Sequence, residues 1–271
     1  MDDLWEFQAA FHDCFARSEP RAHCFDAMVG QGSRLERKSS EPMALHVEGG
    51  TLRGLQRFSS DVPWDEEQRL WNDHQLVAEA MGEPEGVLMF AEPGFVKKGP
   101  DSVGVARQYC GTLGKGENCQ GGVFAGYASQ HGYALVDKRL VLPEAWWTEA
   151  YTARRTQGAV LPEWAFQSKP QLAAAMRQRL VRAGLLPFKY VVADCLSGHS
   201  PDFLDAVDAC LGGTTFVAIP ADTRCGRQRP KTTERASQYK GEARAKRVGV
   251  APAQAACTVA TWAPQVPASR W

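Results

Sequence analysis

The sequence predicts an α/β protein in which a helical N-terminal domain precedes a mixed β-sheet domain. Three observations support this fold class. Apolar residues recur at helical spacing in the first part of the chain, the Gly- and Pro-containing segment MGEPEG follows near residue 84, and short apolar runs bounded by turns come after it. We therefore expect a helical domain at 1–84, a sheet domain at 85–220 and a separate basic segment at 221–271.

Five helices are expected in the N-terminal domain. Apolar residues spaced three to four apart begin at Leu4, and Ser18 and Pro20 interrupt this pattern before a second helix. Acidic residues in the first turn of the fifth helix complement its dipole. The expected helices after the first cover residues 21–29, 40–46, 52–58 and 65–81.

Buried strands and two helices are expected in the sheet domain. GVLMF is short, apolar and bounded by turns, as a buried strand is. The strand at 186–198 carries Asp194 at its end. The expected strands cover 86–90, 118–129, 132–143, 186–198 and 214–220, and the expected helices cover 169–184 and 200–213. This order implies a mixed sheet flanked by helices.

Composition narrows the class of protein. The chain has 271 residues, of which 44% are apolar and 23% charged, and this is an ordinary composition for a soluble protein with a substantial core. Its eight cysteines form no CxxC pair and no Cys/His quartet, so we expect reduced thiols rather than a zinc site. The start MDDLWEFQ is acidic, and no apolar run reaches the ~20 residues that cross a bilayer. We expect a cytoplasmic protein without a membrane partner.

The net charge of zero hides an asymmetry along the chain. From Asp222 onward there are ten Lys/Arg and three Asp/Glu, so this part carries +7 and the first 221 residues carry −7. A basic segment of this kind can remain solvated or can meet phosphates.

Asp194 is the first candidate for a chemical role. In an open α/β sheet, reacting groups gather at the carboxyl ends of neighbouring strands, and Asp194 takes such a position. An aspartate after a strand can equally be a helix cap or a turn former. The residue type alone leaves both alternatives open.

Several long segments together resemble the DDE transposases of bacterial insertion sequences. The likeness covers essentially the whole chain. The segments that carry it are ERKSSEPMA (36–44), GFVKKG (94–99), SVGVARQYCGTLGKGENCQGGVF (102–124), YALVDKRLVLPEAW (133–146), FQSKPQLA (166–173) and LPFKYVVADCLSGHSPDFLDAV (186–207). The resemblance implies an RNase H-like domain behind a helical N-terminal domain, which cuts and rejoins DNA at the terminal inverted repeats of a mobile element.

The same resemblance implies a metal-dependent active site. In the family, two aspartates and a glutamate hold two divalent ions, usually Mg²⁺ and alternatively Mn²⁺. Hard cations take oxygen ligands, so packing cannot replace these carboxylates. The second family aspartate corresponds to Asp194, which is therefore the candidate catalytic and metal-ligating residue.

Two departures put the family's chemistry in doubt. Ala91 stands at the first aspartate, and a methyl group cannot bind a metal. Glu92 is a weak substitute, because successive side chains of a strand face opposite sides and Glu92 should point away from Asp194. The family's glutamate helix, beyond a β-rich insertion, has no counterpart before the chain stops at VPASRW. We therefore expect an incomplete catalytic core, the start of the insertion at 221–271, and a truncated, inactive transposase.

Two positions differ where relatives tend to carry aromatic residues. Ser197 stands in the loop after the strand that ends at Asp194, and Gly226 stands where a large aromatic is expected. In insertion sequences that carry it, such an aromatic can stack on a flipped base, which is worth ~1–3 kcal/mol.

Candidate DNA-binding residues fall in two groups. The first combines cations and Asn118 with interleaved glycines, and its members are Lys97, Lys98, Arg107, Lys115 and Asn118. The second lies in the basic stretch 223–248, which in relatives belongs to the insertion, and its members are Arg227, Lys231, Lys240 and Arg244. The alternatives are a solvated hairpin face for the first group and a disordered tail for the second.

The sequence thus predicts a DDE-type transposase by descent that has lost its cleavage and strand-transfer activity. A second hypothesis is a DNA-binding or regulatory remnant that occupies transposon ends. Its partner would be a second copy of itself or an intact transposase, and when bound to DNA it would be associated with the nucleoid. A third hypothesis is a product that does not fold stably, because an incomplete sheet leaves apolar faces uncovered.

Overall fold

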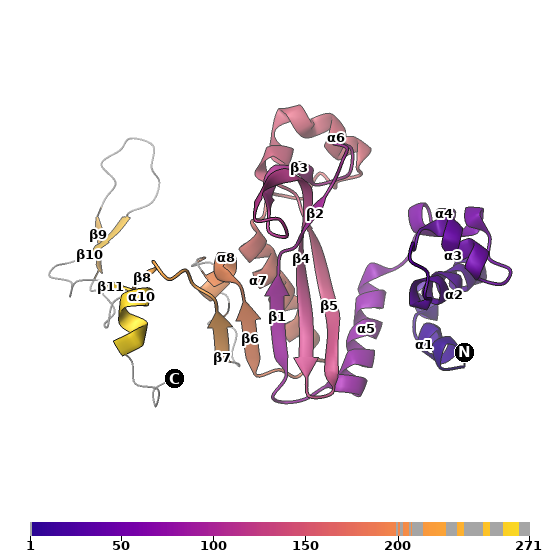
Figure 1. Ribbon diagram of the computed structural model, residues 1–271, viewed down its shortest axis with the longest axis horizontal. Helices are drawn as coiled ribbons and strands as arrows, with labels where there is room; N and C mark the ends of the chain where they lie inside the picture. Colours follow the sequence, from indigo (N-terminus) through magenta and orange to yellow (C-terminus); the bar gives the residue numbers. More distant parts are fainter. Residues whose placement is uncertain are drawn as a thin grey trace.

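The computed structural model describes residues 2–198, 200, 203–205, 207, 214–225, 232–235, 246–249 and 257–265. Figure 1 shows a helical unit at the N-terminal end, a twisted sheet in the middle and small elements toward the C-terminus. Among the described residues, no helix has both the length and the apolar composition needed to cross a membrane. The expected α/β class, with helices before a mixed sheet, is confirmed.

The N-terminal unit contains the expected helices. Their bounds are α1 Asp2–Ala9, the 3-10 turn η1 His12–Cys14, α2 Ser18–Gly32, α3 Ser40–His46, α4 Leu52–Ser60 and α5 Glu66–Met81. Asp65 caps α5, since its Oδ1 accepts a hydrogen bond from the Gln68 amide at 2.9 Å. Helix α2 begins at Ser18, earlier than expected, because Pro20 lies in its first turn, where a missing N–H costs nothing.

A seven-stranded mixed sheet forms the middle of the molecule. Its strands are β1 Val87–Ala91, β2 Gly94–Val96, β3 Val105–Cys110, β4 Lys115–Ser129, β5 Gly132–Val141, β6 Tyr190–Ala193 and β7 Thr214–Val217. The order is β5-β4-β1-β6-β7, with β6 and β7 parallel to β1 and with β4 antiparallel to both β1 and β5. This is the RNase H-like arrangement. Figure 1 shows β1, β6 and β7 pointing toward the end of the sheet where β2 and β3 lie.

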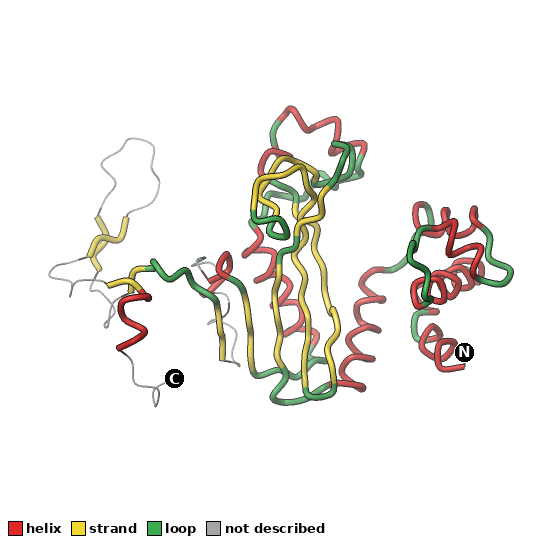
Figure 2. The backbone as a smooth tube through the Cα atoms, viewed as in Figure 1, coloured by secondary structure: helices red, strands yellow, loops and turns green. Residues whose placement is uncertain are grey.

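Helix α7 (Lys169–Ala183) covers one face of the sheet, as Figure 2 allows the reader to follow. It begins with a capping box in which the Ser168 side chain accepts from the Gln171 amide and the Gln171 side chain accepts from the Ser168 amide. Its buried side chains meet alternate residues of the central strands, which form the core Leu88, Phe90, Val123, Ala125, Tyr127 and Val191. Because this face is buried, the strand register is fixed.

A helical segment between β5 and α7 packs on the short strands. It comprises η2 Glu144–Trp147, η3 Glu149–Tyr151 and α6 Thr152–Gln157. Trp146 is fully buried with Ala106 and Leu142, and its Nε1 donates to the Val105 carbonyl at 2.9 Å. One residue therefore joins this segment to β3.

The C-terminal elements are small. They are α8 Cys195–Gly198, β8 Arg224–Cys225, β9 Thr232–Arg235, β10 Lys246–Gly249, β11 Cys257–Thr258, α10 Val259–Trp262 and η4 Ala263–Gln265. Strand β9 pairs with β10 and β8 pairs with β11, in both cases antiparallel. Most of the helix expected at 200–213 lies outside the described residues, but Phe203 and Val207 pack in the core.

Candidate active site and nucleic-acid interface

The candidate active site lies where the parallel strands β1 and β6 end. The last ladder pair joins Phe90 to Ala193, so the next position along the two strands places Ala91 beside Asp194. Both residues are exposed. Adjacent strands are ~4.8 Å apart, so a carboxylate at position 91 would lie within reach of the same cation as Asp194. The methyl group of Ala91 leaves that position without an oxygen donor.

Glu92 turns toward Asp194, and the expectation that it points away is wrong. Its Oε1 accepts a hydrogen bond from the Ser197 hydroxyl at 3.1 Å, and its carboxyl is hydrogen-bonded to Asp194. The expectation assumed the alternation of side chains along a strand. However, β1 ends at Ala91 and β6 ends at Ala193, so Glu92 and Asp194 both lie just past their strands. Strict alternation of side chains holds only within the pleated strand.

Asp194 also acts as a cap for the turn that follows it, which is the structural alternative expected for an aspartate after a strand. Its Oδ1 accepts from the Ser197 amide at 3.3 Å, and its carbonyl accepts from the Gly198 amide at 2.9 Å. The aspartate therefore caps the short turn α8. This turn buries Ser197, whose hydroxyl donates a hydrogen bond to Glu92.

Glu92 keeps its proton to a higher pH than an ordinary glutamate does. Burial raises the pKa of Glu92 from 4.5 to about 7, and the hydrogen bond to Asp194 and the charge of Asp194 act in the same direction. The hydrogen bond from Ser197 and the positive charge of Lys169 oppose this rise in pKa. Near neutral pH the Glu92 carboxyl is therefore protonated in about half of the molecules.

Lys169 is a site residue that the sequence did not single out. It is the first residue of α7, directly after the capping residue Ser168, and it is partly buried near Glu92. The FQSKPQLA segment gave a local signal for the start of a helix. Nothing local indicated that this start faces the end of β1.

The residues present do not fit a two-ion centre. The side chain at position 91 has no oxygen atom that could bind a metal. The carboxyl oxygens of Glu92 and Asp194 already take part in hydrogen bonds with Ser197 and with each other. Within the part of the chain that the structure describes, no third His, Cys, Asp or Glu joins them to form a metal-binding group. A pair of Mg²⁺ ions needs several anchoring carboxylates, and this arrangement supplies two that are hydrogen-bonded to each other.

The pH dependence of stability reports directly on Glu92. Its pKa is raised on folding, so its contribution to the unfolding free energy is fully present below pH 4.5 and is lost as pH rises through about 7. In Glu92→Gln this dependence disappears. We expect the wild type to lose roughly 1–2 kcal/mol relative to the variant between pH 5 and 8, after allowance for solvent screening.

Denaturant unfolding at several pH values, with a chelator present, measures this difference. Exposed Glu79→Gln is the matched control and should follow the wild-type curve. A constant difference between Glu92→Gln and the wild type across this pH range would contradict the raised pKa of Glu92.

The first group of candidate DNA-binding residues lies at the same end of the sheet. Arg107 pairs with Asn118 across β3 and β4, and Lys98, Arg107 and Lys115 are exposed. Asn118 donates to the carbonyls of Lys97 at 2.7 Å and Gly99 at 3.2 Å. Its amide therefore positions the lysine loop, and the cations are the groups that remain for phosphates. Lys115 Nζ lies 3.8 Å from Glu117 Oε2, and this ion pair makes Lys115 less available for a phosphate contact.

A turn connects these cations to the carboxyl pair. Thr112 Oγ1 donates to the Gly94 carbonyl at 2.8 Å, and a Cβ on Gly111 would lie 3.5 Å from the Glu92 carbonyl oxygen. Gly94 has no room for a side chain, since a Cβ there would lie 2.7 Å from Cys110 Sγ. The β3–β4 turn thus lies against the residue that follows β1.

The second group of candidate DNA-binding residues lies outside the described residues, as does Gly226. This holds for Arg227, Lys231, Lys240 and Arg244. The sequence-based prediction for these positions stays a prediction.

The fold and the site together define a class of protein, the RNase H-like domains that carry an acidic residue where a central parallel strand ends. Residues 10–271 match the family model described as DDE superfamily endonuclease. The chain belongs to this family, whose members generally use divalent metals, and the resemblance to transposases of insertion sequences is confirmed.

One curated relative is similar over much of the chain. It is "Probable transposase for insertion sequence element IS701" of Microchaete diplosiphon, which is 30% identical over 210 residues. The alignment covers 74% of this chain and 50% of that protein. The chain therefore spans about half the length of the curated relative that it matches.

Proposed function

We propose that this chain binds DNA at the ends of a mobile element without cleaving it, as a catalytically inactive member of the DDE transposases. The observation that carries the proposal is Ala91, whose methyl group stands beside Asp194 where the family has a metal-binding aspartate. In-line phosphodiester chemistry by two ions depends on carboxylates that hold both ions in place. With Glu92 hydrogen-bonded to Asp194 instead, the site lacks the donors for this chemistry.

The DNA partner is supported by the basic surface at the end of the sheet. Lys97 and Lys98 lie on a loop whose carbonyls are fixed by Asn118, and Arg107 is exposed on the adjacent strand. A fixed backbone with free cations suits phosphate contacts, which supply affinity without requiring cleavage. The specific partner that we propose is the terminal inverted repeat of the element, and the cellular location is the cytoplasm, at the nucleoid when DNA is bound.

A regulatory role is the second candidate. A protein that occupies element ends without cutting them would compete with an intact transposase or assemble with it. The observation that favours this role is the contrast between the two parts of the site, because the lysine loop is held in place whereas the metal position is a methyl group.

Strand cleavage tests the loss of activity. We expect no nicking of duplex DNA carrying the element end by the wild type in Mg²⁺ or Mn²⁺. Asp194→Ala, which removes the family's second aspartate, should give the same background. Cleavage by the wild type that is lost in Asp194→Ala would overturn the proposal, because it would show that Glu92 and Asp194 assemble a working centre.

A further inference from the structure

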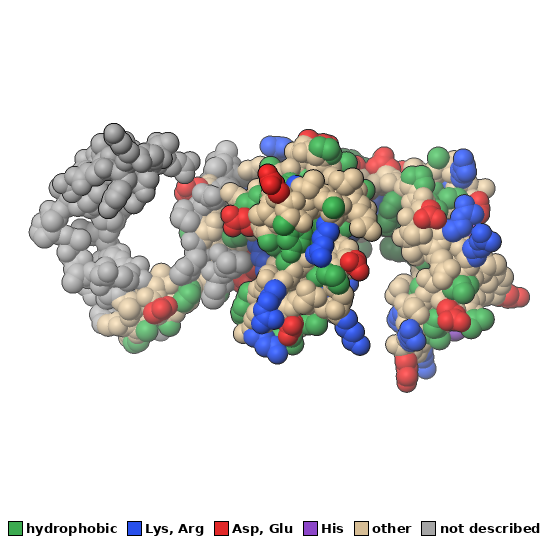
Figure 3. Space-filling view, turned by 90° about the horizontal axis from the view of Figure 1, so that it is seen from above, with side chains coloured by type: hydrophobic (Ala, Val, Ile, Leu, Met, Phe, Trp, Pro, Cys, Tyr) green, Lys and Arg blue, Asp and Glu red, His purple; other side chains and the backbone are tan. Residues whose placement is uncertain are grey.

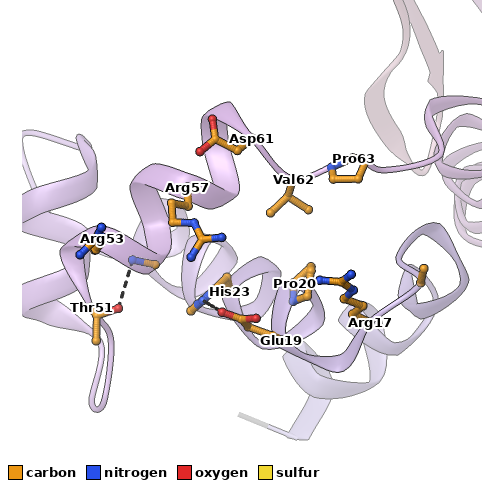
Figure 4. A pocket seen from close by; sticks show the side chains of 12 residues that line it. Arg17, Glu19, Pro20, His23, Thr51, Arg53, Arg57, Asp61, Val62 and Pro63 are labelled. Carbon is orange, nitrogen blue, oxygen red and sulfur yellow. Dashed lines mark hydrogen bonds and ion pairs between the residues drawn. The ribbon is translucent and has the colours of Figure 1, made fainter.

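A groove between α2 and α4 gathers three arginines of the N-terminal unit. Its volume is about 690 Å³, and its lining includes Arg17, Arg53 and Arg57. Figure 4 shows Arg57 on α4 and Arg17 at the start of α2 reaching into the space between the two helices from opposite sides. Arg53 and Arg57 are one helical turn apart, about 6 Å along the axis, so they lie on the same side of α4.

The side chains of these three arginines form no polar contacts with the described part of the chain. All three are exposed, and none takes part in an ion pair or side-chain hydrogen bond there. By contrast, Arg69 pairs with Asp73, and Arg21 donates to the Phe15 carbonyl at 3.0 Å. Arginines that the fold does not use are available to an external ligand.

The concentration of arginine is unexpected in this unit. Residues 1–84 contain sixteen Asp/Glu and only eight Lys/Arg, and three of those eight cations line one groove. Two acids, Glu19 and Asp61, share the lining, and Glu19 lies 3.9 Å from His23. Figure 3 shows Lys and Arg side chains interspersed with acids on this part of the molecule. The basic surface is local rather than general.

The walls of the groove are fixed by close packing. A Cβ on Gly54 would lie 2.5 Å from His23 Cε1, so the His23 ring packs directly against the α4 backbone at this position. Thr51 Oγ1 accepts from the Gly54 amide at 3.1 Å and caps α4, and Leu55 beside Gly54 is buried. Both arginines of α4 are therefore held on a preformed surface.

The chemistry of the groove matches phosphate. Guanidinium groups present planar donor forks that bind phosphate oxygens in pairs. Helix α2 has 15 residues, and no side chain caps its first turn, because the N-cap residue Arg17 has no hydrogen-bond acceptor in its side chain. The positive end of the helix dipole therefore adds to the site. The arginines are exposed along an open groove, and this suits a polyanion that passes across it.

We propose that the α2–α4 groove binds backbone phosphates of duplex DNA, as a contact separate from the lysine loop at the end of the sheet. The inference rests on the proposed DNA partner and adds a second place of contact. Two other exposed arginines of this unit, Arg34 and Arg37, lie between α2 and α3 and do not line the groove.

Fluorescence anisotropy with labelled duplex DNA, repeated over a range of salt concentrations, tests the groove. Arg53→Gln/Arg57→Gln should weaken binding at least tenfold at low salt, because two phosphate contacts are lost. The slope of log affinity against log salt should fall by about two. Arg53→Lys/Arg57→Lys keeps both charges and loses the forks, so it should bind with intermediate affinity and a wild-type slope.

The matched control is Arg34→Gln/Arg37→Gln, which removes the same charge outside the groove and should stay near the wild type. Equal losses in both double variants, or none in the groove variant, would overturn the inference. Lys97→Gln/Lys98→Gln, in the same assay, reports on the lysine loop, so failure of that proposal is seen separately. A wild type that does not bind duplex DNA overturns both, and a nucleoside triphosphate that competes as strongly as duplex DNA overturns the assignment to a polymer.

Discussion

Ala91→Asp is expected to create a divalent-ion site that the wild type lacks, with Mn²⁺ affinity raised by at least about tenfold. The parallel ladder places position 91 beside Asp194 on the neighbouring strand, so the new carboxylate would share a cation with Asp194. Without a cation, the three close carboxylates at positions 91, 92 and 194 would repel each other in the variant. A bound cation removes this repulsion and therefore favours their ionised forms. Isothermal titration with Mn²⁺ measures the change.

Two further variants make this result specific. Ala91→Asn has nearly the same shape without the charge and should bind Mn²⁺ no better than the wild type. Ala91→Asp/Asp194→Ala should lose the gain, because a lone carboxylate holds the ion weakly. If the wild type already binds Mn²⁺ as tightly as Ala91→Asp, then Glu92 and Asp194 form a metal site and the inactive assignment is wrong.

Trp146→Ala is expected to cost ~3–5 kcal/mol of unfolding free energy, the usual range for truncating a large buried aromatic residue. Trp146 is fully buried, lies 5.3 Å from the Tyr151 ring and donates to the Val105 carbonyl. Its carbonyl also accepts a hydrogen bond from Arg155. Removing the indole leaves a cavity between the 144–157 segment and β3, and β3 carries Arg107. DNA binding through the lysine loop should weaken together with stability.

Denaturant unfolding measures the loss of stability, and hydrogen exchange locates it. Trp146→Phe keeps most of the apolar contact but leaves the Val105 carbonyl without its donor, so its cost should be smaller. Exposed Trp164→Ala is the control for removing a tryptophan and should change stability little. Unchanged exchange in β3 in Trp146→Ala would show that the segment and the strand are not energetically linked.

Local signals in the sequence located most helices well. The helix expected at 40–46 is α3, and the helix expected at 65–81 is α5, whose cap at Asp65 is a side chain hydrogen-bonded within its own first turn. The helix expected at 169–184 is α7, which begins with a capping box and is followed by Gly184 at φ 66°. Helix caps and apolar spacing depend on residues only a few positions apart, so they can be recognised from the sequence alone.

The strands were harder to predict where their partners are distant. The three-residue β2 and the strand β3 were not expected, because their segments carry glycines, lysines and exposed side chains rather than an apolar run. Both exist because β4 is long enough to pair with them beyond its pairing with β1 and β5. Strand propensity there follows from the neighbour and not from the segment itself.

The sequence alone determined the family, most of the helices, the strands with long apolar runs, and the absence of a carboxylate at position 91, since each of these is a property of residue identity or of short-range pattern. Only the tertiary structure decided that Glu92 meets Asp194 and Ser197, the latter 105 residues away, and that Arg17 joins Arg53 and Arg57 in one groove. The physical reason is that these contacts depend on where separate elements end and how closely they pack. No pattern within a few residues encodes either quantity.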